Sequence, residues 1–510
     1  MADQAGCSEA GVTVPVNKGV IIGKRQPAPE AYPKPLDIFY GIPYATAERF
    51  RPAQLCAPVD KGRVLDAQNE GKYVPCPMAS FETEKGTLRL KIFRPSKPSS
   101  DSSSGDTELP VVVGIHVRPP SGAGSRIAGG VGTETCSRGG TLGFKTGDGA
   151  EGHAGVELNL GLRDQRAAVD WVVRWAGAFG GGGDVTLMGV GAGAHSVSSI
   201  SARLAIDHLV HLAPLTFTEA ILESGAPTAQ SVLCPRHARS LAQHASLRAW
   251  AARRRRPIRC ATSRRVSSTW PFQPVVDGAG GLIPDIPLRQ VDALCKSDRA
   301  ATLSVITGFC SHEATQFVPL NLATNAQFRA WFSALVPSLT GGHRDALERL
   351  YPDPVTGPSK RYENAPGCRH GAQFRRLHEA YAHSAYICPV LHTAHRLSCA
   401  GARVYLYKYA AMSEPFGAAS HGDQAPVVAH DMETLRGQRG LVAVAEEMAS
   451  RWGQFMASPT GEIAPWPRFQ SPFGDGRGGG ELLVFGKGND EAAGRKSEGV
   501  AVRKRILTDE

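Results

Sequence analysis

The sequence predicts an α/β fold in which helices flank a mainly parallel central sheet. Residues 109–116 form a continuous apolar run of strand length, as expected for a strand that is buried on both faces of a parallel sheet. Residues 164–179 repeat apolar side chains at helical spacing, with Trp171 and Val172 on the apolar face. Strand-like and helical segments alternate along the rest of the chain, which is the order that builds a parallel sheet.

The other expected elements are short segments bounded by glycine and proline. β-Branched and aromatic residues between such breaks are typical of strands. Strands are therefore expected at residues 19–23, 37–44, 88–93, 185–188, 219–225, 303–307 and 404–409, with a further helix at 196–204.

A tight glycine-rich turn, residues 189–193, joins the expected strand at 185–188 to the helix that follows. Glycine on both sides of such a turn lets the strand and the helix approach closely. Strand, sharp turn and helix in this order form the nucleophile elbow of hydrolytic enzymes, which exposes the residue at its apex. Gly191 stands at that apex and has no side chain to offer.

We expect a single domain over residues 1–510, because no internal repeat divides the chain. Residues 1–18 are expected to form an irregular arm. Segments rich in glycine, proline, serine or arginine predict irregular structure at 96–106, 117–140 and 226–270, and the tail at 471–510 is expected to be partly disordered.

The composition is that of a soluble globular protein, with 42% apolar and 20% charged residues. No segment approaches the roughly 18 apolar residues of a membrane span, so none is expected. The N-terminus lacks a basic start and an apolar core, so we expect no secretory signal and a cytoplasmic location. The 11 cysteines include no CxxC pair, which predicts free thiols, no metal site and a reducing compartment.

The net charge of +10 is concentrated in one arginine-rich segment, residues 248–265, which contains no acidic residue. Such a patch can bind nucleic acid or act as an import signal. Only Trp250 and Trp270 accompany it, and no nucleic-acid-binding fold is indicated. We therefore interpret the segment as a solvated loop and expect no nucleic-acid partner.

A series of short motifs runs in order along nearly the whole chain. They are YGIPYA at 40–45, RFRP at 49–52, LGF at 142–144, NLGLRDQ at 159–165, WV at 171–172, FGG at 179–181, GVGAGAHSV at 189–197, ILESG at 221–225, PVVDG at 274–278, PD at 284–285, CP at 388–389, YLY at 405–407, WGQF at 452–455 and WP at 466–467. Together they resemble the type-B carboxylesterase (cholinesterase-like) family, and in style its fungal branch. The resemblance implies an α/β-hydrolase fold and no cofactor.

The resemblance also implies ester hydrolysis by a serine, a histidine and a glutamate. In that reaction the serine attacks the ester carbonyl, the histidine takes its proton, and the acid orients the imidazole. Glu313, in GFCSHE at 308–313, matches the acid. His421, in GAASHGD at 417–423, matches the base. An ordinary surface glutamate and a solvated loop histidine are the alternatives.

The nucleophile does not match, because Gly191 replaces the serine and Val190 replaces the preceding glutamate. Ser196 and His195 are candidate substitutes, although Ser196 lies more than a helical turn further on. The oxyanion hole is degenerate as well, with Val117, Arg118 and Ala192 at its positions and two prolines after Arg118. Proline has no N–H group to donate to an oxyanion.

Two further differences from the family pattern also indicate that the family site has been lost. A central strand of the family is expected to be missing around 117–140, where no apolar run occurs. Thr87 replaces the cysteine that would pair with Cys76 in a family disulfide. A degenerate or mis-spliced coding sequence would explain both.

Three functions therefore stay open. The chain is an esterase with impaired or lost activity, a non-catalytic binding protein, or a protein in which His421 and Glu313 act as a general base on water. The expected partner is a small ester or a related metabolite, and the sequence predicts no oligomeric state.

Overall fold

One sheet connects the strands of the protein from end to end. The structure is a computed structural model that describes residues 11–27, 35–48, 51–69, 85–96, 108–115, 131–135, 158–198, 217–229, 274–278, 281–336, 338–357, 361–364, 369–411, 419–474, 479–486 and 502–507. The strands follow the order β1-β2-β3-β6-β8-β7-β9-β10-β11-β12-β13-β14, with β4 on β3 and β5 on β2.

The strands lie close to the expected segments. They are β1 (Gly11–Val16), β2 (Gly19–Gln26), β3 (Leu36–Glu48), β4 (Gln54–Leu55), β5 (Val64–Asp66), β6 (Lys85–Pro95), β7 (Leu109–Ile115), β8 (Val131–Thr135), β9 (Gly181–Val190), β10 (Glu219–Glu223), β11 (Ser304–Cys310), β12 (Arg403–Tyr409), β13 (Glu481–Phe485) and β14 (Val502–Ile506). Consecutive pairs from β8 to β13 along the sheet are parallel, whereas the outer pairs are antiparallel. The predicted α/β class with a mostly parallel sheet is confirmed.

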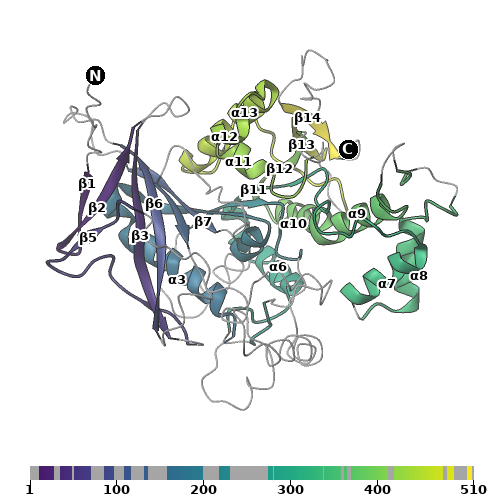
Figure 1. Ribbon diagram of the computed structural model, residues 1–510, viewed down its shortest axis with the longest axis horizontal. Coiled ribbons are helices and arrows are strands. Elements are labelled where there is room, and N and C mark those ends of the chain that lie inside the picture. The colour runs from purple at the N-terminus through teal and green to yellow at the C-terminus, as the bar shows by residue number, and fades with distance from the viewer. Residues whose placement is uncertain are drawn as a thin grey trace, which may run out of the picture.

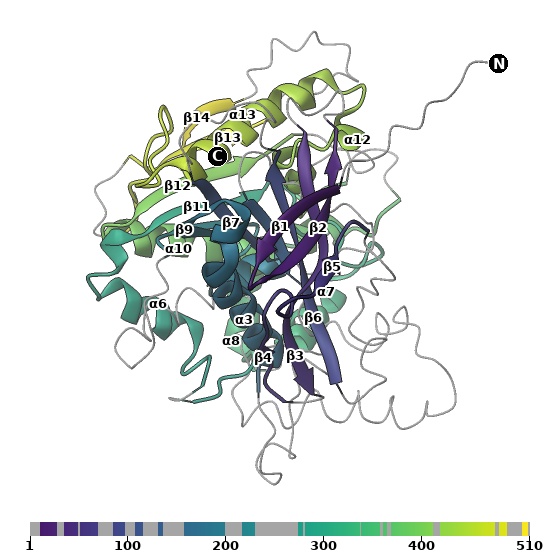
Figure 2. The ribbon, with the colours of Figure 1, turned by 90° about the vertical axis from the view of Figure 1, so that its left-hand side faces the viewer.

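Helices cover both faces of this sheet. They are α3 (Leu160–Trp175), α6 (Pro287–Cys295), α7 (Asn325–Leu335), α8 (Gly341–Leu350), α9 (Phe374–Ala382), α10 (Cys388–Cys399), α11 (Gln424–Val428), α12 (Met432–Leu435) and α13 (Arg439–Ala457), with shorter turns η1 (Ala176–Phe179), η3 (Ala300–Thr302) and η4 (His383–Ile387). In Figure 1, α11–α13 lie above the parallel strands and α3 and α6 lie below them. Figure 2 shows the N-terminal strands β1–β3 in front.

Alternating side chains of the strands build two separate cores. On β11, Val305 packs with α3, α6 and α10, whereas its neighbour Ile306 packs with α11, α12 and α13. Period-two alternation places neighbouring residues on opposite faces of a sheet, so a strand covered on both faces has to be apolar throughout. All seven residues of β11 are buried. The apolar face of α3 is also buried, with Trp171 and Val172 each 1% exposed.

Two predictions of irregular structure are wrong. Residues 11–16, expected within an irregular arm, form β1, which pairs antiparallel with β2. Val14 and Val16 are buried because every second residue of this segment faces the core. Residues 131–135, expected within a segment that lacks a strand, form β8 between β6 and β7. The backbone supplies those ladder hydrogen bonds, so an apolar run is not required.

Other predicted irregular segments fall largely outside the described residues. This holds for 97–106, 117–130, 136–140 and 230–270, which include the arginine-rich segment. Within the tail at 471–510, β13 and β14 are ordered strands, while 475–478, 487–501 and 508–510 are not described. Among the helices that are described, none combines the length and the apolar character needed to cross a membrane.

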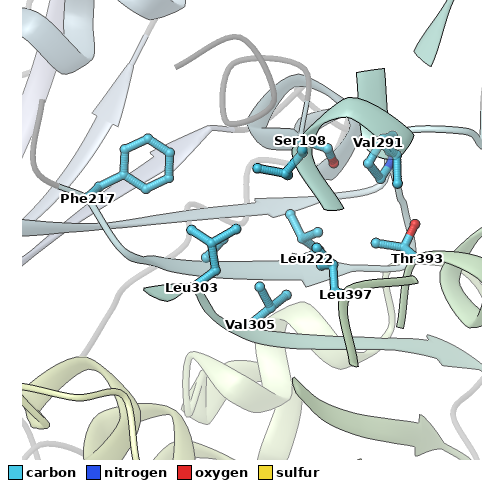
Figure 3. Close-up of a pocket in the computed structure, with 11 residues that line it drawn as sticks. Ser198, Phe217, Leu222, Val291, Leu303, Val305, Thr393 and Leu397 are labelled. Atoms are coloured by element: carbon cyan, nitrogen blue, oxygen red, sulfur yellow. The ribbon is translucent and has the colours of Figure 1, made fainter. Parts of the chain in front are cut away.

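A small apolar cavity of about 40 Å³ lies on the face of the sheet that α6 and α10 cover. Figure 3 shows Leu222, Leu303, Val305 and Leu397 on one side of it, with Ser198 and Val291 on the other. A cavity with an apolar lining stays dry, because a water molecule or a polar ligand needs polar partners. The cavity is therefore a packing defect rather than the site to which the motifs point.

Candidate active site

The candidate site lies where parallel strands end. Gly191 follows directly after β9, Glu313 comes three residues after β11, and His421 follows β12. Because the carboxyl ends of parallel strands meet at one edge of a sheet, loops that leave different strands there can converge. The positions that the motifs identify as nucleophile, acid and base share this edge.

Gly191 forms the sharp turn between β9 and a helical segment at 192–198. Its φ angle is +53°, in the left-handed region. The turn is held from both sides, since the Gly191 N–H donates to Glu223 O at 2.8 Å and the His195 N–H donates to Gly191 O at 3.1 Å. The predicted strand and turn are present, and the predicted helix at 196–204 is seen as far as residue 198, after which it lies outside the described residues.

The elbow depends on a close approach of its two arms at Gly189. A Cβ built on this residue would overlap the backbone of Gly193 on the helical arm. The same position therefore excludes every residue with a side chain. This observation explains the glycine spacing of the motif in physical terms.

Glu313 and His421 are brought together by the loops that carry them. His312 and Ser420 form an isolated parallel β-bridge, and the His312 N–H donates to Ala419 O at 2.9 Å. The next residue of each loop joins the pair, since His421 Nδ1 lies 2.6 Å from Glu313 Oε2. The other oxygen of Glu313 accepts from the Cys310 N–H at 2.6 Å, and its side chain is fully buried.

The imidazole of His421 packs beside two aromatic rings that also stack on each other. The ring centroid of Phe317 is 5.2 Å away, edge-on, and that of Tyr386 is 4.6 Å away. Gln316 Nε2 donates to the His421 carbonyl at 2.9 Å. The side chain of His421 is 14% exposed, so one part of the ring stays accessible.

The ring of His421 reaches into the space above Gly191. A Cβ built on Gly191 would overlap His421 Nε2 and would lie 2.9 Å from its Cε1. A residue with a side chain at this position would require the imidazole to move. The histidine thus fills the place that a nucleophile side chain would otherwise take.

The remaining predicted positions give a mixed result. Val117 and Arg118 lie outside the described residues, and Ala192 is the first residue of the helical segment at 192–198. His195 is buried, and its Nδ1 donates to Ala226 O at 2.7 Å. Ser196 is 7% exposed and forms no hydrogen bond with His421 within the described part of the chain. Neither candidate substitute therefore takes the place of the serine here.

A buried polar cluster behind the elbow was not predicted from the sequence. Trp452 Nε1 donates to Glu223 Oε1 at 2.8 Å, and Gln424 Nε2 lies 3.4 Å from Glu223 Oε2. Gln424 also accepts from Cys310 Sγ at 3.0 Å. The backbone of Glu223 accepts from the Gly191 N–H, and the backbone of Cys310 donates to Glu313. The cluster therefore supports both the elbow and the acid. A glutamate inside the apolar run at 219–225 was the available signal.

Burial controls the ionisation of this cluster. Loss of solvent raises the pKa of Glu223 to about 7, although hydrogen bonds from Trp452 and Gln424 oppose the shift. Burial also lowers the pKa of His195 to about 4, and the hydrogen bond to Ala226 opposes that shift. His195 is therefore neutral at pH 7. No group of three or more histidine, cysteine, aspartate or glutamate side chains suited to a metal occurs among the described residues.

Comparison with known proteins agrees with this geometry. Residues 10–472 match the carboxylesterase family. "Probable N-octanoylanthranilate hydrolase AqdA2" of Rhodococcus erythropolis is 27% identical over 473 residues, which cover 84% of this chain and 91% of that protein. Relatives occur in fungi, bacteria and animals, so the fungal branch stays a prediction.

Two fungal relatives match over shorter stretches. "Secreted lipase 4" of Gibberella zeae is 28% identical over 280 residues, 49% of this chain and 47% of that protein. "Inactive carboxylesterase-like protein VdtD" of Byssochlamys spectabilis is 26% identical over 379 residues, 62% of this chain and 60% of that protein. The match thus spans about half of the length of the first relative and less than two thirds of the second.

Proposed function

The chain belongs to the carboxylesterase family, and we propose that it binds a small ester or a related metabolite without forming the serine acyl-enzyme of that family. A covalent acyl-enzyme needs a nucleophilic side chain beside the base. Gly191 has none, and His421 Nε2 occupies the corresponding space. This single observation carries the proposal.

The rest of the site supports binding. The Glu313–His421 pair is held by the Cys310 N–H and by the bridge between His312 and Ser420. Phe317 and Tyr386 offer apolar surface beside the imidazole. A few convergent polar groups next to aromatic side chains are typical of small-molecule sites. One relative is named an inactive carboxylesterase-like protein, which agrees with loss of the family reaction.

A fluorophosphonate probe tests the absence of a serine nucleophile. The probe phosphonylates an activated serine, so we expect no label on this chain. Gly191→Ser is the matched variant, because it returns a hydroxyl group beside His421, and we expect it to gain label. Labelling of a serine in the unaltered chain, located by peptide mass spectrometry, would contradict the proposal.

Ligand binding is measured separately by calorimetric titration with 4-nitrophenyl butyl ether. This molecule has the shape of an aryl ester but contains no acyl group. We expect saturable binding that weakens when Phe317→Ala removes one aromatic side chain beside His421. Absence of binding to the folded chain would contradict the binding half of the proposal.

A further inference from the structure

Resting on the proposed function, we propose that His421 itself is the nucleophile of a residual reaction, in which its Nε2 attacks aryl esters directly. Glu313 orients the imidazole and stabilises its positive charge. The substrate class is aryl esters, and simple alkyl esters are excluded. The reaction uses the groups that remain at the site and needs no serine.

The position of the imidazole is the first argument. In a serine esterase the histidine stands behind the serine, which alone reaches the carbonyl carbon. Here Gly191 places no side chain between Nε2 and the substrate side of the elbow. Nε2 forms no hydrogen bond with a described residue, whereas Nδ1 is engaged by Glu313 at 2.6 Å. The nitrogen that faces the elbow is therefore available.

The tautomer is the second argument. A carboxylate accepts hydrogen bonds only, so Nδ1 has to carry the proton that points to Glu313 Oε2. In the neutral ring, Nε2 then holds the lone pair. Glu313 cannot turn away easily, because its other oxygen accepts from the Cys310 N–H at 2.6 Å and its side chain is fully buried. The pair is thus set to present a nucleophilic nitrogen.

The neighbouring histidine does not have this role. His195 Nδ1 donates to Ala226 O at 2.7 Å, which leaves its Nε2 as a buried atom without a partner. His195 is only 8% exposed. The side chain of His421 is 14% exposed, and it also adjoins the elbow. His421 is therefore the more accessible of the two histidines, and its Nε2 is the one that adjoins the elbow.

The reaction balances without a further reagent. Nε2 of His421 forms a bond to the ester carbonyl carbon while the bond from that carbon to the aryl oxygen breaks. The aryloxide leaves and takes a proton from water. The acyl-imidazolium, paired with the Glu313 carboxylate, then reacts with water to release the carboxylic acid and a proton, and the neutral imidazole returns.

The leaving group decides which esters react. A p-nitrophenoxide ion is about as weak a base as imidazole, so it can leave and the intermediate goes forward, whereas the more basic phenoxide leaves less readily than imidazole. An alkoxide is a much stronger base, so imidazole is expelled instead and the alkyl ester is regenerated. The proposal therefore predicts hydrolysis of p-nitrophenyl acetate, much slower hydrolysis of phenyl acetate, and none of ethyl acetate.

Steady-state hydrolysis and a trapping experiment test the inference on the full chain. We expect p-nitrophenyl acetate to be hydrolysed on the order of 10²-fold faster than by an equal concentration of free imidazole, a gain typical of a positioned side chain. His421→Ala removes the attacking nitrogen and should reduce the rate to no more than that of free imidazole, and Glu313→Gln should reduce it about tenfold or more. After rapid acid quench, mass spectrometry should find the acetyl group on the peptide that contains His421.

Controls separate this inference from the proposed function. His343→Gln, at the exposed start of α8, keeps a side chain that can complete the capping box and should leave the rate unchanged. A rate that survives His421→Ala, or a folded chain with no rate above free imidazole, would overturn the inference and leave the proposed function intact. A serine labelled by the fluorophosphonate would overturn the proposed function instead.

Discussion

At the scale of single residues, Gly191 relieves the strain of the elbow as well as removing the nucleophile. Its φ of +53° lies in the region that costs a residue with a side chain about 1–2 kcal/mol. The imidazole of His421 lies in the space that a Cβ at this position would take. The glycine thus makes the turn easier to form, and stability and chemistry change together.

Gly191→Ala should therefore destabilise the protein. We expect a loss of at least about 1–2 kcal/mol from the backbone alone, and more because the new Cβ displaces His421. Urea denaturation followed by tryptophan fluorescence measures the change. Gly177→Ala is the control, because a Cβ there meets no atom within 4 Å. An equal loss in both variants would show that the elbow has no special strain.

Glu223 makes the stability depend on pH. Its pKa in the folded state is raised by burial from 4.5 to about 7, so the folded protein holds this proton more tightly than the unfolded chain does. Stability must then fall as pH rises from about 4.5 to about 7, and the loss is complete above that window. At about 1.4 kcal/mol per pKa unit, the group accounts for about 3 kcal/mol.

The variant Glu223→Gln isolates this effect, since an amide keeps an oxygen to accept from Trp452 and does not titrate. We expect the stability of the unaltered protein, relative to the variant, to fall by about 3 kcal/mol between pH 4.5 and pH 7. Contributions of Glu219 and His195 occur in both proteins and cancel. Parallel stability curves over this range would contradict the assignment.

At the scale of elements, hydrogen bonds join the motif at 159–165 to the motif at 274–278, and we call this set of bonds the clamp. Asn159, before α3, donates from Nδ2 to Val275 O at 2.8 Å and to Asp277 Oδ2 at 2.9 Å. Asp277 also accepts from the N–H groups of Leu282 and Ile283, at 2.9 and 2.6 Å. Within this chain the two motifs therefore hold the start of α3.

Asp277→Ala should release this clamp. It leaves three buried or part-buried donors without their acceptor, each of which costs about 1–3 kcal/mol when unsatisfied. We expect a total loss of about 3 kcal/mol or more, measured by urea denaturation. Asp345→Ala breaks a surface pair with Arg329 and should cost less than about 1 kcal/mol. Comparable losses would show that the clamp is not structural.

Elements with a continuous apolar pattern could be predicted, and elements held by backbone pairing could not. The run at β7 and the helical face at α3 were evident, because burial on a sheet or a helix imposes its own spacing. The strand β8 has the sequence VGTET and was missed, since its ladder bonds to β6 and β7 need no particular side chain. The meeting of Glu313 and His421 followed from motif positions, but the position of the ring over Gly191 required coordinates.

At the scale of the whole molecule, the candidate site is attached to β10 and β11, the buried strands in the middle of the sheet. All residues of β10 and β11 are buried, and helices cover both faces of these strands. The Glu313 loop leaves β11 directly, and its first amides are bonded back into the fold, including Ser311 N–H to Tyr409 O at 2.9 Å. In contrast, β1 and β14 pair on one side only within the described part of the sheet.

Hydrogen exchange should therefore show protection that extends from β11 into the loop of Glu313. Local opening free energy is highest for buried central strands and lowest at edges. We expect amides of β10, β11 and residues 310–312 to exchange at least about 100-fold more slowly than those of β1 and β14, since about 1.4 kcal/mol of opening free energy corresponds to a factor of ten. Mass spectrometry of peptic fragments measures these rates. Loop amides that exchange as fast as those of β14 would mean that Glu313 and His421 meet only transiently, and a histidine nucleophile would then lack its fixed partner.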